Sequence, residues 1–206
     1  MESTPKSHRR RRRGLLALLM AGTAIMGATG ATFSLAVFTS QATVAANSFT
    51  AGTIILTTNP VSALLTTGAL MPGDTINGTL VVTNGGTGDL RYAISADSTT
   101  TGGLNTVILI TIKTADTAGG ITCNAWTGTT IFGGAGGAAI TNVAMAPIVG
   151  NPNTGPDAGD RTLTVATHNE TLCFRAVLPL ATANVYQGTT ASYTFQFDAE
   201  QTKNNP

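Results

Sequence analysis

The feature that most constrains the fold of this chain is the alternation of apolar and polar residues in short runs. The clearest run is 189–199, in which Tyr193, Phe195 and Phe197 are separated by single polar residues. A period of two is that of a β-strand with one buried face. A helical period is nearly absent from the rest of the chain, so the sequence predicts an all-β protein.

Further runs rich in Thr, Val and Ile are bounded by Gly, Asn and Asp, which predicts strands and turns. About eight strands without intervening helices form two packed antiparallel sheets, and a jelly roll and an immunoglobulin-like sandwich fit this pattern equally. Residues 115–160 are irregular, with a glycine-rich loop at 133–139 and a turn cluster at 150–160. The strands expected before 189–199 are 48–57, 75–84, 90–96, 107–114, 161–166 and 171–178.

The N-terminus predicts an export signal over residues 1–36. Arg9–Arg13 form a positive segment, and an apolar stretch follows from Leu15. Small residues at the end of this stretch predict cleavage by a signal peptidase between Ala36 and Val37. A retained membrane anchor stays open, because the stretch approaches the roughly 20 apolar residues that a span requires. We expect a secreted protein in the extracellular matrix or at the cell surface.

The distribution of charge argues against nucleic-acid binding. Six of the eleven basic residues lie in the first thirteen positions, and the chain after residue 36 has five basic and nine acidic residues. Its net charge is about −4, whereas a phosphate-binding surface needs clustered Lys and Arg. The roughly 170 residues of this part suit one domain with a single core.

Cys123 and Cys173 are the only cysteines, and both lie in the part that is expected to be exported. Two cysteines in an oxidising compartment most simply form a disulfide bond. Two buried free thiols are the alternative. A redox site is not expected, because the cysteines do not form a C-x-x-C motif.

His168 is the only histidine after residue 36, and one histidine does not supply the ligands of a common zinc site. We expect it to form a surface ion pair with Glu170 instead. Asn153, Asp157 and Asp160 leave two interpretations open, a calcium site and a set of turn-forming residues. We expect no catalytic residue, no cofactor and no bound metal, and therefore no enzyme.

Four segments lie in a fixed order along the chain: Ala36–Thr39, Asn47–Leu56, Leu70–Thr87 and Tyr186–Gln201. In that order they resemble the TasA/camelysin family of Gram-positive bacteria, which includes secreted biofilm-matrix fibre proteins with a SipW-type signal peptide. Residues 98–170 match nothing in the family pattern, and the two cysteines depart from TasA itself.

The resemblance implies a jelly-roll domain over residues 49–206, preceded by a donor-strand segment at 37–48. It implies donor-strand exchange, in which the N-terminal segment of one subunit completes a sheet of its neighbour. The donor strand would contain Val37, Phe38, Val44 and Phe49, and it carries no charge. Such a contact is head-to-tail and therefore builds a homopolymer.

The resemblance therefore predicts a structural protein of extracellular fibres. Its expected partners are other copies of itself, with other matrix proteins as an open alternative. A cell-surface adhesin that does not polymerise and binds through residues 115–160 is the first alternative. A camelysin-type metallopeptidase is the second, and the single histidine after residue 36 argues against it.

Overall fold

The computed structural model describes residues 51–62, 64–67, 69–116 and 122–205. The expected signal peptide, its cleavage site at Ala36 and Val37 and the expected donor segment lie outside these residues. Within the described ranges, no helix is long and apolar enough to cross a membrane.

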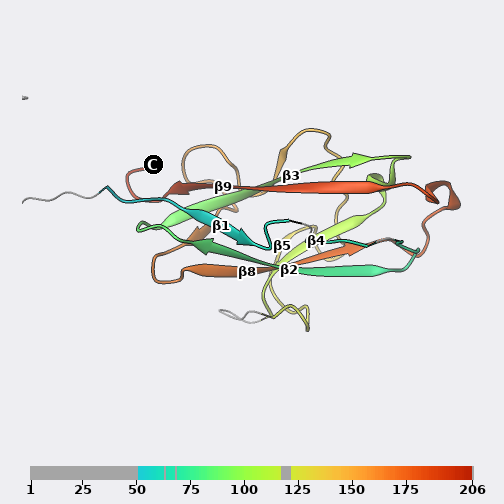
Figure 1. Ribbon diagram of the computed structural model, residues 1–206, viewed down its shortest axis with the longest axis horizontal. Coiled ribbons are helices and arrows are strands. Elements are labelled where there is room, and N and C mark those ends of the chain that lie inside the picture. Colours follow the sequence, from blue (N-terminus) through green and yellow to red (C-terminus); the bar gives the residue numbers. More distant parts are fainter. Residues whose placement is uncertain (1–50, 63, 68, 117–121, 206) are drawn as a thin grey trace, which may run out of the picture. The chain divides into compact units, whose positions relative to one another are not determined.

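The described residues form nine β-strands in two antiparallel sheets that lie face to face (Figure 1). This confirms the predicted all-β sandwich. Successive long strands cross from one sheet to the other, a connection found in jelly rolls. Sheet A contains, in spatial order, β1 (Leu56–Asn59), β2 (Thr75–Asn84), β8 (Asn169–Val177), β4 (Leu109–Thr114) and β5 (Thr130–Phe132).

Sheet B is built around one long central strand, β3 (Leu90–Thr100). Strand β9 (Ala191–Gln201) pairs with β3 along its whole length. Two short strands, β6 (Ala146–Val149) and β7 (Arg161–Leu163), pair with β3 as well. The connecting segments include two short 3-10 helices, η1 (Leu104–Thr106) and η2 (Asn184–Tyr186).

Most predicted strands lie close to their predicted positions, and 75–84 is found unchanged as β2. The prediction for 48–57 was wrong in extent, because β1 begins only at Leu56. Residues 51–55 are held by the turn between β2 and β3 instead: Gly85 N donates to Ile55 O at 2.9 Å, and Thr87 N donates to Thr53 O at 3.0 Å. The region 115–160 contains β5 and β6, which its composition did not predict.

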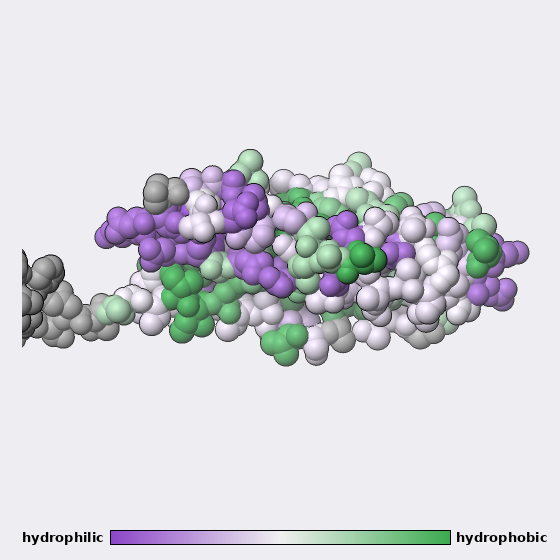
Figure 2. All heavy atoms as spheres, turned by 90° about the horizontal axis from the view of Figure 1, so that it is seen from above, coloured by the Kyte–Doolittle hydropathy of each residue, from purple (hydrophilic) through white to green (hydrophobic). Residues whose placement is uncertain are grey.

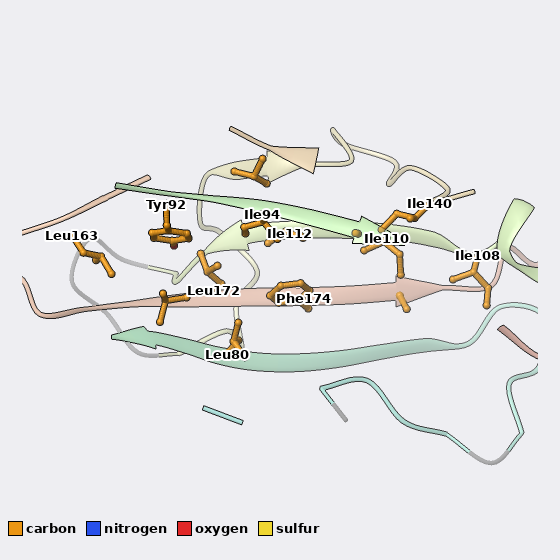
Figure 3. Packing of buried hydrophobic residues seen from close by; sticks show 14 of the residues in the cluster. Leu80, Tyr92, Ile94, Ile108, Ile110, Ile112, Ile140, Leu163, Leu172 and Phe174 are labelled. Carbon is orange, nitrogen blue, oxygen red and sulfur yellow. The ribbon is translucent and has the colours of Figure 1, made fainter. Parts of the chain in front are cut away.

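The hydrophobic core lies between the two sheets (Figure 3). Phe174 and Ile112 from sheet A face Tyr92 and Ile94 from sheet B, and all four are almost fully buried. The ring of Phe174 also meets the ring of Phe195 edge-on, with centroids 5.1 Å apart. Burial of one such side chain contributes about 1.5–3 kcal/mol, so this cluster holds the sheets together.

The connecting segments gather at two ends, because the long strands run antiparallel along the sandwich. We call the end formed by residues 51–55, 85–89, 164–168 and 202–205 the proximal end, and the end formed by residues 71–74, 101–108 and 178–190 the distal end. The chain enters its described part and leaves it at the proximal end (Figure 1).

Each end is fixed by the turn chemistry of its sequence. At the distal end, Asp74 N donates to Met71 O at 2.9 Å, and Gly73 has a φ of 96° that favours glycine. This is the type II turn expected of Pro72-Gly73. At the proximal end, buried Asn84 donates from Nδ2 to the carbonyls of Gly88 and Leu163.

Candidate functional site

The most distinctive feature of the sandwich is the outer edge of β9. All eleven residues of β9 pair with β3, from Gln201 opposite Leu90 to Ala191 opposite Thr100, without a break in register. Among the described residues, no strand pairs with the other side of β9. Sheet B therefore ends in a long, regular edge strand.

Main-chain bonds beyond both ends of this pair fix which groups of β9 face β3. Thr101 N donates to Thr190 O at 2.9 Å, and Thr202 N donates to Asp89 O at 3.1 Å. Bonded positions alternate in an antiparallel pair, so the even-numbered residues of β9 bond to β3. The odd-numbered residues direct their N–H and C=O groups to the outer edge. They are Ala191, Tyr193, Phe195, Phe197, Ala199 and Gln201.

The aromatic residues of this set also line the side of the core beside β9. Tyr193, Phe195 and Phe197 are only half-buried, although they pack against the core. The Tyr193 hydroxyl is buried and has no hydrogen-bond partner among the described residues. Burial raises the pKa of Tyr193 to about 12, so the hydroxyl keeps its proton near neutral pH. An added strand would thus meet main-chain bonding groups and incompletely covered aromatic rings together.

The β9 edge lacks the usual protection against strand pairing, which is given by short length, Lys, Pro or a bulge. Its first seven residues, Ala191–Phe197, carry no charge. By contrast, β6 has four residues and contains Pro147, and its register with β3 is shifted. The edge strands of sheet A, β1 and β5, have four and three residues. Among the described strands, β9 is the edge best suited to accept another strand.

The last part of β9 is less open, because Glu200 is already engaged. Its carboxylate forms an ion pair with Arg91 and accepts hydrogen bonds from Gly155 N at 3.0 Å and Asn205 Nδ2 at 2.7 Å. The hydrogen bond from Arg91 lowers the pKa of Glu200 below its usual value. These bonds tie the loop at 150–160 to the outer face of sheet B.

A second candidate site lies over the outer face of sheet A, around Trp126. The guanidinium carbon of Arg175 lies 3.8 Å from the Trp126 ring centroid, and Lys113 Nζ lies 5.3 Å from it. Both are cation–π contacts. Trp126 has a φ of 58°, a conformation that bulky residues rarely adopt. Neither cation forms an ion pair with a carboxylate within the described ranges.

The loop that presents Trp126 is held from several sides. Cys123 and Cys173 form a disulfide bond that ties the loop to β8. Asp116 accepts hydrogen bonds from Ala125 N and Thr127 N, both at 2.9 Å, and the bond from Ala125 is the main cause of its lowered pKa. This arrangement fixes an aromatic ring beside two positive charges on the surface.

The ion pair expected between His168 and Glu170 is wrong. Glu170 pairs with Arg161 instead and accepts a hydrogen bond from the Tyr92 hydroxyl at 2.7 Å. Arg161 and Tyr92 are register partners of β7 and β3, so the sheet brings both to Glu170. His168 lies just before β8, where its carbonyl accepts from Asn84 N at 2.6 Å. Burial raises the pKa of Tyr92 well above its usual range.

In the turn cluster at 150–160, one aspartate carboxylate accepts hydrogen bonds from the main chain of the same cluster. Asp160 accepts hydrogen bonds from Asn151 N and Asp157 N, both at 2.9 Å. These bonds favour the turn-forming interpretation over the calcium site. Among the residues that the structure describes, no three or more His, Cys, Asp or Glu side chains are grouped to hold a metal ion.

The sequence did not single out Trp126 or the outer edge of β9. A signal for Trp126 was available, since it is the only tryptophan and follows Cys123 by three residues. The edge position of β9 had no local signal, because strand order depends on residues far apart in the chain. The expected donor residues, Val37, Phe38, Val44 and Phe49, lie outside the described residues.

Comparison with known proteins gives one family match. Residues 14–102 match the family described as Camelysin metallo-endopeptidase. This match supports the resemblance to the TasA/camelysin family. The matched part ends two residues after β3, so it includes β1, β2 and β3 but neither β9 nor the Trp126 loop. No curated protein matches the chain.

Proposed function

We propose that this protein is a secreted structural protein that assembles into extracellular or cell-surface fibres of a biofilm matrix by donor-strand exchange. Residues 37–48 of one copy would add to the outer edge of β9 in the next copy. The observation that carries this proposal is the long, unprotected β9 edge beside half-buried aromatic residues.

The sequence of the donor segment suits this edge. On its even positions, Phe38, Val44 and four small residues form one face, whereas the other face is more polar and carries Val37, Thr39, Gln41, Thr43, Ala45 and Asn47. Because side chains alternate along a strand, the first face would cover the rings of β9 and the second would face water. Each added main-chain bond would contribute about 0.5–1.5 kcal/mol.

Such addition creates a heterologous contact, since the donor and the acceptor are different surfaces of the chain. A heterologous contact whose rotation does not close produces a filament. Cleavage before Val37 would release the donor after export, so that fibres would form outside the cell. The expected partners are therefore other copies of the chain and, during export, a signal peptidase.

The test is electron microscopy of the protein that starts at Val37, beside the same protein without residues 37–48. We expect filaments from the first and monomers from the second. A matched control replaces residues 37–48 by a shuffled sequence of the same composition, which keeps length and polarity but loses the apolar face. Monomers from the protein that starts at Val37, over a range of pH and salt, would refute fibre assembly.

A second function, a surface adhesin, is supported by the Trp126 site. A half-buried aromatic ring beside two half-buried cations that form no ion pair among the described residues suits an anionic ligand. The discriminating experiment measures binding of a uronate polysaccharide to monomers by calorimetry, with Trp126→Ala as the variant. Binding that is lost in the variant, by a protein that never polymerises, would favour the adhesin.

Because the matched family is described as a metallo-endopeptidase, a peptidase assay is a necessary control. We propose that the chain has no catalytic role. A peptidase assay of the purified protein with added zinc, with and without a chelator, checks this. Cleavage that the chelator abolishes would overturn the proposal and favour a metallopeptidase.

A further inference from the structure

We infer that the two ends of the sandwich contact each other end-to-end between successive copies of this chain, the distal end of one copy against the proximal end of the next. This inference rests on the proposed fibre function. It adds which surfaces meet and in which direction the donor strand runs. The partner is a second copy of the chain.

The distal end exposes large aliphatic side chains on a fixed scaffold. Met71, Leu180 and Val185 are 64%, 80% and 75% exposed. The turn that carries Met71 is tied to the β8–β9 connection, because Gly73 N donates to Leu178 O at 2.7 Å and Leu178 N donates to Asp74 O at 3.0 Å. These apolar side chains are therefore held by ordered main chain.

The distal end is also almost free of charge. Residues 101–108 and 178–190 contain no Lys, Arg, Asp or Glu. The one carboxylate of this end, Asp74, accepts a hydrogen bond from Met71 N at 2.8 Å and so belongs to its own turn. Exposed apolar surface with few charges is typical of the centre of a protein interface.

The proximal end carries a matching apolar surface formed by Ile54, Ile55 and Val165, which are 37–46% exposed. Main-chain bonds fix it in place, since Ile55 O accepts from Gly85 N and Val165 N donates to the Asp89 carboxylate at 2.7 Å. Figure 2 shows strongly hydrophobic residues near both ends of the described part. Each copy thus has a different apolar patch at each end, and the patch at the proximal end lies beside the charged residues Asp89 and Lys203.

The position of residue 51 decides between the possible pairings of these ends. The chain enters the described part at the proximal end. If two distal ends met, the donor segments would emerge at the far sides of the pair and reach no β9 edge. If a proximal end meets a distal end, residue 51 of one copy lies beside Ala191 of the next. Residues 49–51 then need to span only about 10 Å.

This contact also fixes the direction of the donor strand. Strand β9 runs from the distal to the proximal end. A donor that enters at the distal end has Ser48 near Ala191 and Val37 near Gln201, so it runs antiparallel to β9. Twelve donor residues extend about 40 Å, close to the roughly 36 Å of the eleven residues of β9. The donor first meets Ala191–Phe197, the uncharged part of the edge.

The test measures the critical concentration for fibre formation of the protein that starts at Val37. Leu180→Lys places a charge in the proposed contact, so we expect the critical concentration to rise at least about tenfold. Val143→Lys is the matched control, because Val143 is equally exposed but lies outside both ends. Adding Ile55→Glu to Leu180→Lys is expected to restore assembly. Thermal unfolding verifies that each variant is folded.

Cysteine cross-linking tests the direction. In fibres of the Ser48→Cys/Ala191→Cys variant we expect a ladder of cross-linked species, whereas Ser48→Cys/Gln201→Cys is expected to give none. Filaments that tolerate Leu180→Lys as well as Val143→Lys, or that cross-link through Gln201→Cys, would overturn the inference and leave the proposed fibre function intact. A chain that forms no filament at all would overturn both.

Discussion

Loss of the Cys123–Cys173 disulfide is expected to lower the stability of the domain by about 4 kcal/mol. The two cysteines are 50 residues apart in sequence. In the chain-entropy treatment, a closed loop of this length reduces the entropy of the unfolded chain by about 14 cal/mol/K, which gives about 4 kcal/mol at 25 °C. This value is a large part of the 5–15 kcal/mol that stabilises a typical domain.

The assay is urea unfolding of residues 51–206, followed by the fluorescence of Trp126, with and without a reducing agent. Reduction changes only the two sulfurs, so it avoids the packing change of a substitution at buried Cys173. The control is the Cys123→Ala/Cys173→Ala variant, which the reducing agent should not affect. A loss of less than about 1 kcal/mol on reduction would show that the unfolded chain is not restricted as this reasoning requires.

Three further predictions follow from the core, the Trp126 loop and the β9 edge. Phe174→Ala is expected to destabilise the domain by about 3–5 kcal/mol in urea unfolding, because it leaves a cavity between the sheets; a loss below 1 kcal/mol would contradict the packing described. The pKa of Asp116 is lower in the folded protein than in the unfolded chain, so its charged carboxylate stabilises the fold at pH values above the ordinary carboxyl pKa. This stabilisation is lost as the pH falls through the pKa that Asp116 has in the folded protein. Trp126 fluorescence should therefore change at acidic pH, and Asp116→Asn should abolish this change. Ala191→Pro removes an outward N–H from the uncharged part of β9, so we expect a normal circular dichroism spectrum with fewer fibres by electron microscopy; an unchanged yield of fibres would argue against this edge as the acceptor.

Strands whose limits follow from a local sequence pattern were predicted well. The limits of β2 follow from the turn-forming residues on both sides of it, and β9 follows from its period of two. The start of β1 was misplaced because residues 51–55 have strand-like composition but bond to the turn at 85–87. Strand propensity does not reveal which main-chain groups a segment will form hydrogen bonds with.

The features of the candidate sites could not be predicted from the sequence, because they depend on contacts between distant residues. Glu170 meets Arg161 and Tyr92 only after β3, β7 and β8 have assembled. The outer edge of β9 likewise depends on where eight other strands lie. The sequence indicated an uncharged donor segment, but not which strand would accept it.

The pairing of β3 with β9 determines how late in the synthesis of the chain the outer edge of β9 can form. The two strands are separated by about one hundred residues of chain, and a chain is synthesised from its N-terminus. The proposed donor segment therefore emerges early, whereas the proposed acceptor edge exists only after the last strand has emerged and paired with β3. A partly synthesised chain would thus offer a donor but no acceptor, so neighbouring chains could not polymerise through incomplete copies.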